Sequence, residues 1–179
     1  MKKLGIVAAT ALLVALVSST CFAGVKAGQT QVNLAGSISS TKPDTGDKTT
    51  STMITTGLGY FLQDNISLGG ALFVDYSKTG SNKTLTNVIN GQAKYHLAPK
   101  EILVPYVGIQ LGYMGVDMNG SSGSGYDYGA MAGIDYFITE NASLNVELNY
   151  RKDVFKISSV EFKQDTTALL FGLSYFFGK

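Results

Sequence analysis

Hydrophobic and polar residues alternate strictly along residues 141–151 (NASLNVELNYR). Apolar residues occupy every second position from Ala142 to Tyr150, and Ser, Asn, Glu and Arg fill the other positions. A period of two residues is typical of a β-strand with one apolar and one polar face. The same alternation predicts seven more strands after Gly24, separated by polar segments that contain Gly, Pro, Asn or Asp.

The connections between these strands alternate in length. Residues 63–65, 98–101 and 139–141 predict short turns, and we expect longer loops at the positions listed next. The longer loops are residues 39–50, 78–83, 117–125 and 152–164. Residues 57–68 (GLGYFLQDNISL) also resemble residues 133–144 (GIDYFITENASL), which indicates a repeating hairpin. The pattern predicts an all-β fold, an eight-stranded antiparallel up-and-down barrel with one short-turn end and one long-loop end.

Two kinds of barrel fit this pattern, and they differ in which face points outward. A soluble lipocalin-like carrier would turn the Leu/Ile/Val face inward, whereas a membrane barrel would turn it toward lipid. The opposite face is rich in small residues, such as Gly57, Gly108 and Gly129, which suit a narrow interior. The sequence therefore favours a transmembrane barrel.

Tyrosines on the apolar face fall near both ends of the predicted strands. Aromatic girdles of this kind are typical of the two interfaces between membrane and water. The girdle residues are Tyr60, Tyr95, Tyr136 and Tyr175 at the short-turn end, and Tyr76, Tyr113, Tyr126 and Tyr150 at the long-loop end.

Charged residues within the strands occupy the inward face. Buried charges need partners, so we expect an interior polar network. Its predicted members are Asp75, Lys94, Asp135, Glu147 and Arg151, with Gln110 and Asp127 as further candidate partners. Glu147 and Arg151 lie about 13 Å apart along one strand, too far for a direct pair. We therefore expect each to meet a charge or amide from another strand.

The first 23 residues have the features of a cleaved signal peptide. Lys2 and Lys3 precede an apolar run, and Cys21-Phe22-Ala23 places small residues before a cleavage point. The predicted organisation is a signal peptide at 1–23 and a single barrel domain at 24–179. The chain carries 14 Lys and Arg against 13 Asp and Glu, so its charge balance suggests no nucleic-acid partner.

The last strand carries the most specific motif. Gly172, Tyr175 and Phe177 fit the pattern Gly-x-x-aromatic-x-aromatic. On this motif and the strand pattern, the chain resembles the small eight-stranded outer-membrane barrels of Gram-negative bacteria, of the OmpX and OmpA-transmembrane type. Two features depart from that family: Leu170 stands where a polar residue is commoner, and Gly178-Lys179 follows the terminal aromatic.

The resemblance implies Sec-type export to the cell outer membrane, short periplasmic turns and longer extracellular loops. It implies contact with outer-membrane lipid and lipopolysaccharide, and recognition of Gly172, Tyr175 and Phe177 by the barrel-assembly machinery. The sequence gives no sign of an oligomer, so we expect a monomer.

Catalytic chemistry has little support in the sequence. A lipid-modifying barrel hydrolase would need a Ser/His pair, and His96 is the only histidine. The residue two positions after His96 is Ala98 rather than Ser, so a structural histidine is favoured. We expect no enzyme activity, no cofactor and no metal site. A narrow channel is a further alternative, although eight strands leave room for little more than side chains.

The final connection holds a second apolar pattern. Phe155, Ile157, Val160 and Phe162 keep the inward phase of the flanking strands, so these strands are predicted to continue as a hairpin that turns at Ser158-Ser159. Such a ribbon would bind a host or surface protein, or its side chains would only cap the barrel mouth. The functional hypothesis is a non-enzymatic surface protein for adhesion, host contact or envelope integrity.

Overall fold

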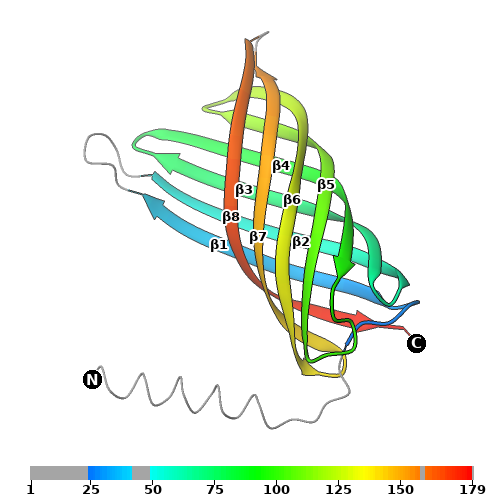
Figure 1. Ribbon diagram of the computed structural model, residues 1–179. Coiled ribbons are helices and arrows are strands. Elements are labelled where there is room, and N and C mark those ends of the chain that lie inside the picture. Colours follow the sequence, from blue (N-terminus) through cyan, green and yellow to red (C-terminus); the bar gives the residue numbers. More distant parts are fainter. Residues whose placement is uncertain (1–23, 42–48, 158–159, 179) are drawn as a thin grey trace, which may run out of the picture.

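The computed structural model describes residues 24–41, 49–157 and 160–178, which form eight antiparallel strands in one closed barrel (Figure 1). The strands are β1 (Thr30–Thr41), β2 (Thr49–Gln63), β3 (Ile66–Thr79), β4 (Asn82–His96), β5 (Leu103–Met118), β6 (Ser121–Thr139), β7 (Ala142–Ile157) and β8 (Val160–Phe177). Each strand pairs with its neighbours in the sequence, and β1 pairs with β8. The predicted fold is confirmed. The predicted signal peptide, residues 1–23, lies outside the described residues.

The apolar face of the strands points outward. On β5, Ile109 and Leu111 are each 66% exposed, whereas Gln110 between them is 4% exposed. On β7, the polar side chains of Glu147 and Arg151 are buried in the same way. The lipocalin-like alternative is therefore wrong, because its aliphatic face would line the interior. No helix within the described ranges is long and apolar enough to cross a membrane.

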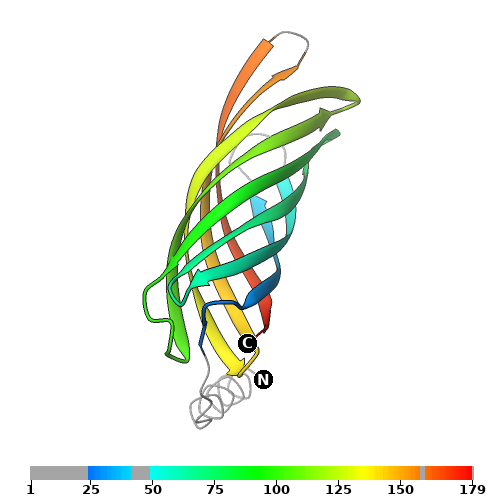
Figure 2. The same ribbon diagram turned by 90° about the vertical axis from the view of Figure 1, so that its right-hand side faces the viewer.

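The two ends of the barrel are built differently. The turns at Asp64-Asn65 and Glu140-Asn141 lie at the short-turn end, where the C-terminal end of β8 also lies. At the opposite end, β3–β4, β5–β6 and β7–β8 continue as paired hairpins, and we call this the hairpin end (Figure 2).

The hairpins correct the loop positions expected from the sequence. Most of residues 78–83, 117–125 and 152–164 are strand rather than loop. The β5–β6 turn is formed by Asn119 and Gly120, whose φ angles of 53° and 87° suit a two-residue hairpin turn. Beyond the apolar band both faces of a strand meet solvent, so backbone pairing continues where the hydrophobic alternation has ended. The first connection, residues 42–48, and the turn at Ser158-Ser159 lie outside the described residues.

The barrel closes along a short seam between β1 and β8. Their pairing runs only from Thr30 opposite Phe177 to Gly36 opposite Phe171. Past this point β1 continues with β2 and β8 continues with β7, so the two strands diverge toward the hairpin end (Figures 1 and 2).

The interior consists of three layers. An apolar cluster, the short-turn cluster, contains Val25, Phe61, Val104, Phe137 and Phe176. A second, the hairpin cluster, contains Ala35, Met53, Ala71, Phe73, Val88, Met114, Val116, Phe155 and Leu170. Polar side chains lie between the two clusters. On β5, for example, the inward side chains run from Val104 in the short-turn cluster, through Tyr106 and Gln110 in the polar layer, to Met114 in the hairpin cluster.

Candidate functional site

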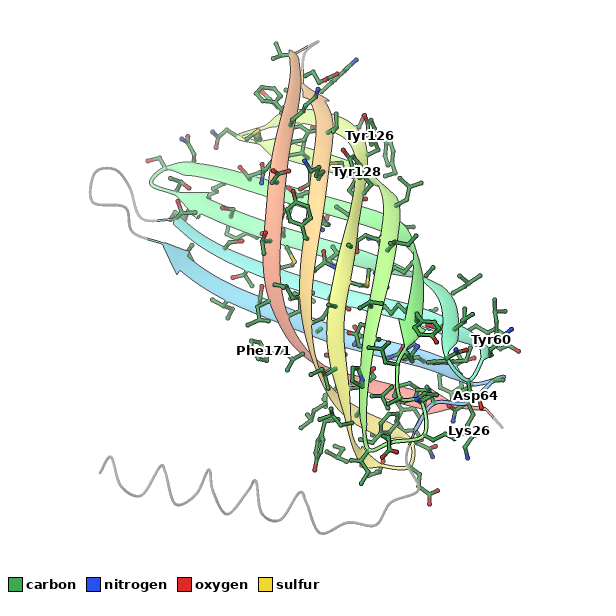
Figure 3. The ribbon with its side chains drawn as sticks, viewed as in Figure 1. Lys26, Tyr60, Asp64, Tyr126, Tyr128 and Phe171 are labelled. Carbon is green, nitrogen blue, oxygen red and sulfur yellow. The ribbon has the colours of Figure 1, made fainter. Side chains whose placement is uncertain are left out.

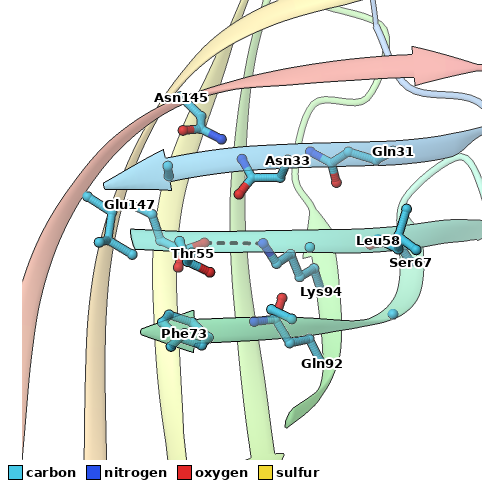
Figure 4. Close-up of a pocket in the computed structure, with 16 residues that line it drawn as sticks. Gln31, Asn33, Thr55, Leu58, Ser67, Phe73, Gln92, Lys94, Asn145 and Glu147 are labelled. Atoms are coloured by element: carbon cyan, nitrogen blue, oxygen red, sulfur yellow. Dashed lines mark hydrogen bonds and ion pairs between the residues drawn. The ribbon is translucent and has the colours of Figure 1, made fainter. Parts of the chain in front are cut away.

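The middle layer is organised around Glu147. Its Oε2 atom lies 3.1 Å from Lys94 Nζ (Figure 4). The same oxygen accepts a hydrogen bond of 2.8 Å from the Tyr106 hydroxyl. Its other oxygen accepts a hydrogen bond of 3.1 Å from Asn149 Nδ2. These contacts join β4, β5 and β7 through the interior, and they give a mostly buried carboxylate the partners it needs.

The network continues from Asn149 toward the hairpin cluster. Asn149 Nδ2 donates to Gln110 Oε1 at 3.1 Å. Gln110 Nε2 lies 3.4 Å from Asp127 Oδ2. We call the connected residues Lys94, Tyr106, Gln110, Asp127, Glu147 and Asn149 the polar network.

The five network residues predicted from the sequence all point inward, but only Lys94 and Glu147 pair with each other. Asp135 accepts a hydrogen bond of 2.8 Å from Ser143, and Asp75 accepts one of 2.8 Å from Ser51. These two carboxylates thus meet hydroxyl groups of neighbouring strands rather than charges.

Arg151 has acidic neighbours on its own strand and on the next one. Its Nε lies 3.7 Å from Asp153 Oδ1 on the same strand, a partner that was not expected, and its charge also acts on Asp127 of β6, one of the predicted candidates. Residues two apart on a strand share a face, so their side chains can meet without a second strand. The guanidinium also lies over the Phe73 ring, with 5.1 Å from Cζ to the ring centroid.

Sequence reasoning missed Tyr106, Asn149 and Asp153. All three are buried and have polar interior contacts. Strand phase could have identified them, because each of the three occupies an inward-facing position of its strand. Apart from Phe155 and Leu170, sequence reasoning also missed the members of the hairpin cluster, because the rest of the inner face was characterised by its small and polar residues.

A small polar cavity lies beside the Lys94–Glu147 pair. Its volume is about 30 Å³, which is room for about two water molecules. Gln31, Asn33, Thr55, Gln92 and Asn145 are among the side chains around it (Figure 4). Apolar residues of the two clusters lie on either side of this layer.

His96 lies at the short-turn end of β4 and is only 1% exposed. Its ring centroid is 4.8 Å from that of Phe61 and 5.6 Å from that of Tyr106. Within the described ranges, no hydroxyl or carboxylate hydrogen-bonds either ring nitrogen. The arrangement therefore lacks the hydrogen-bonded nucleophile and base that a Ser/His hydrolase uses.

Tyrosines surround the outer surface near both ends of the barrel. Figure 3 shows Tyr60 near the short-turn end and Tyr126 and Tyr128 near the hairpin end. Seven of the eight predicted girdle tyrosines are exposed on the outward face, and Tyr136 is half-buried. Tyr128 was missed, although it shares the outward phase of Tyr126 and stacks on it with ring centroids 6.4 Å apart.

The C-terminal motif divides between the two faces of β8. Tyr175 and Phe177 point outward and stack with 6.5 Å between ring centroids. Gly172 faces inward against β1, where an added Cβ would overlap the Leu34 carbonyl oxygen and the Ala35 side chain. Leu170, which departs from the family pattern, is buried in the hairpin cluster.

The β7–β8 hairpin has one apolar and one charged face. On the apolar face, the Phe155 and Phe162 rings stack with centroids 5.5 Å apart. Phe155 is buried and Ile157 packs on the hairpin cluster, whereas Phe162 is 41% and Val160 57% exposed. Ion pairs lie on the charged face: Lys152–Asp165, Lys156–Glu161 and Lys163–Glu161. The apolar face thus includes residues that cap the barrel mouth and residues that remain uncovered.

Comparison with known proteins identifies one family. The sequence model described as "Outer membrane protein beta-barrel domain" matches residues 9–177. No curated protein sequence matches the chain.

Solved structures give the same fold. Neisserial surface protein A is 21% identical, with 82% of this chain and 95% of that chain covered and a TM-score of 0.58. OprG from Pseudomonas aeruginosa is 19% identical, with coverages of 87% and 99% and a TM-score of 0.60. The N-terminal β-barrel domain of OprF from the same organism is 20% identical, with coverages of 84% and 98% and a TM-score of 0.55. At these sequence identities, the structural similarity shows that the chain shares the fold of these proteins and nothing further.

Proposed function

The chain belongs to the family of outer membrane protein beta-barrel domains, and on this premise we propose that it is a non-enzymatic surface protein whose β7–β8 hairpin contacts another macromolecule. The barrel lies in the outer membrane of a Gram-negative bacterium, with its aliphatic face toward lipid. The short-turn end is placed in the periplasm and the hairpin end outside the cell, following the usual arrangement of such barrels.

The exposed apolar pair on the hairpin carries this proposal. Val160 and Phe162 lie on the part of β8 that extends past its pairing with β1, so one backbone edge of this segment has no strand partner among the described residues. An edge with adjacent apolar side chains can add a strand from another protein. The charged opposite face keeps the hairpin soluble.

Attachment of bacteria to a host-cell monolayer tests the proposal. Cells that express the protein are expected to attach more than cells without it, and Val160→Ser with Phe162→Ser should abolish the gain. The matched control is Glu161→Ser with Lys163→Ser, which changes the charged face of the same strand and should leave attachment unchanged. Equal attachment by wild type and the apolar-face variant would contradict the proposal.

The proposed partners follow from the location. We expect a monomer that contacts outer-membrane lipid and lipopolysaccharide and is inserted by the barrel-assembly machinery through Gly172, Tyr175 and Phe177. Loss of insertion in cells, with normal refolding of purified protein, is the expected result for Tyr175→Ala with Phe177→Ala.

A lipid-modifying enzyme is the first competing function. It would require His96, which is buried against Phe61 and Tyr106. Under our proposal, lipid A from whole cells is unchanged by His96→Ala. A change in lipid A composition that depends on His96 would favour the enzyme.

A narrow channel is the second competing function. An ion crossing the barrel would have to pass the short-turn cluster, the polar network and the hairpin cluster in turn. Under our proposal, protein in planar bilayers gives no steady conductance. A stable, reproducible conductance level would favour the channel.

A further inference from the structure

The seam between β1 and β8 opens on the membrane side of the barrel. In the described part of the chain, their pairing ends at Gly36 opposite Phe171. A cavity of about 690 Å³ lies where the strands diverge, between Gly36–Ile38 on one side and Thr166–Leu169 on the other. This volume falls within the range of small-molecule sites, about 300–1,000 Å³.

The strand register places this opening beside the tyrosine girdle at the hairpin end, which is the outer-leaflet side in the orientation proposed above. On β7, Tyr150 of the girdle at the hairpin end lies opposite Thr167, which lines the cavity. On β3, Tyr76 of the same girdle lies opposite Thr52, which lines it from the other side. The cavity therefore begins at the interface and continues toward the hydrocarbon.

The rim of the opening is aliphatic and aromatic. Ile38, Ile54, Leu169 and Phe171 line it and face outward, and Ile38 is 80% exposed. Figure 3 shows Phe171 on the outer surface of β8. None of the four carries a polar group, so the rim suits an acyl chain better than a polar solute.

The inner end of the opening reaches the barrel interior. Met53 of the hairpin cluster lines the cavity. Ser51, Asp75 and Thr166 also line it, and they line a second cavity of about 320 Å³ at the hairpin end as well. The lateral opening is thus adjacent to a space inside the barrel, with these side chains forming the wall between them.

The two free strand edges can also close the opening. Continuing the seam in its present register would place Ser37 opposite Leu170 and Ile38 opposite Leu169. Ser37 and Leu170 both have the inward phase of their strands, and Ile38 and Leu169 both have the outward phase. Lipid cannot hydrogen-bond free backbone groups, so unpaired β1 and β8 edges at membrane depth are unfavourable, and pairing them in this register satisfies them.

We propose that the β1–β8 seam is a lateral gate that admits the acyl chain of an outer-leaflet lipid into the cavity beside Met53. The head group remains at the interface near Thr52 and Thr167, while the chain passes between Ile38 and Leu169. The gate closes by extending the β1–β8 ladder. This inference is independent of the partner proposed for the β7–β8 hairpin.

The absence of tryptophan from the sequence provides the test. Single-tryptophan variants of the mature protein are refolded into vesicles of phosphatidylcholine with brominated or ordinary acyl chains. Met53→Trp reports on the cavity, and Ala168→Trp, which also lines it, replaces Met53→Trp if that variant fails to refold. The controls are Ile109→Trp on the lipid face and Val88→Trp in the hairpin cluster.

Brominated chains should quench Met53→Trp at least half as strongly as Ile109→Trp, with little effect on Val88→Trp. Adding Ile38→Cys and Leu169→Cys should lock the gate through a disulfide. Quenching of Met53→Trp should then fall to the level of Val88→Trp, and reducing the disulfide should restore it.

Equal quenching of Met53→Trp and Val88→Trp, without the cysteines, would overturn the proposal. Quenching of Met53→Trp by aqueous acrylamide alone would overturn it too, because the opening would hold water. A cysteine pair that never forms the disulfide would overturn the closing step.

Discussion

Lys94 Nζ lies 3.1 Å from Glu147 Oε2, which ties β4 to β7 across the inside of the barrel. These strands are not neighbours in the sheet, since β5 and β6 separate them. Both side chains are largely buried, so each charge depends on the other. The pair stabilises the barrel through its interior, in addition to the backbone hydrogen bonds of the wall.

Glu147→Leu is expected to lower the free energy of unfolding by about 3–5 kcal/mol, because it leaves Lys94 buried without its partner. Urea unfolding of the refolded barrel measures the change. The double variant Lys94→Met with Glu147→Leu should recover much of the loss, since no buried charge is left alone. An unchanged midpoint in Glu147→Leu would count against the network.

Tyr106→Phe removes one hydroxyl, whose hydrogen bond to Glu147 is 2.8 Å long. We expect a loss of about 1.5–3 kcal/mol in the free energy of unfolding, as for other hydrogen bonds to charged groups. Tyr113→Phe is the matched control, because Tyr113 is exposed on the outward face and the same atom is removed. Equal effects of the two substitutions would be inconsistent with a structural role for the interior hydroxyl.

Gly172→Ala should hinder closure of the barrel. Its new Cβ would overlap β1 at Leu34 and Ala35, within the short seam. Refolding yield, read from the heat-dependent gel shift of purified protein, should fall sharply. Gly115→Ala should refold like wild type, because nothing lies within 4 Å of a Cβ added there. Since no assembly machinery is present in this assay, a normal yield of Gly172→Ala would leave Gly172 with a recognition role only.

Leu170→Ala should lower the free energy of unfolding by about 2–5 kcal/mol, because it opens a cavity in the hairpin cluster. Leu173→Ala on the lipid-facing side of the same strand is the control. Lipid can fill the space left by that substitution, so its effect should be smaller. Similar losses for both variants would argue against a packed interior at Leu170.

Strand phase allowed most of the fold to be predicted from the sequence. The alternation through Leu144, Val146 and Leu148 assigned the outward face of β7, and Glu147 and Arg151 then had to face inward. The hairpin extensions could not be predicted in the same way. Beyond the apolar band, residues such as Lys156 and Glu161 lie on solvated strands, where polar residues no longer distinguish strand from loop.

Phase gave less information about the interior contacts. It places Arg151 and Asp153 on one face, but which of several inward carboxylates Arg151 meets depends on the tilt and stagger of the strands. The length of the β1–β8 seam has no signal in the sequence either. Ile38 and Leu169 have matching outward phase, yet in the structure β1 and β8 have already diverged at this level.

Electrophoresis of outer-membrane fractions, with and without boiling, tests most directly whether the aliphatic face of this barrel meets lipid. The account predicts that the protein is found in that fraction, and that the unboiled sample migrates as a compact species which shifts on heating. A periplasmic protein whose mobility does not change on boiling would contradict it, because residues such as Ile109 and Leu111 would then have to be buried.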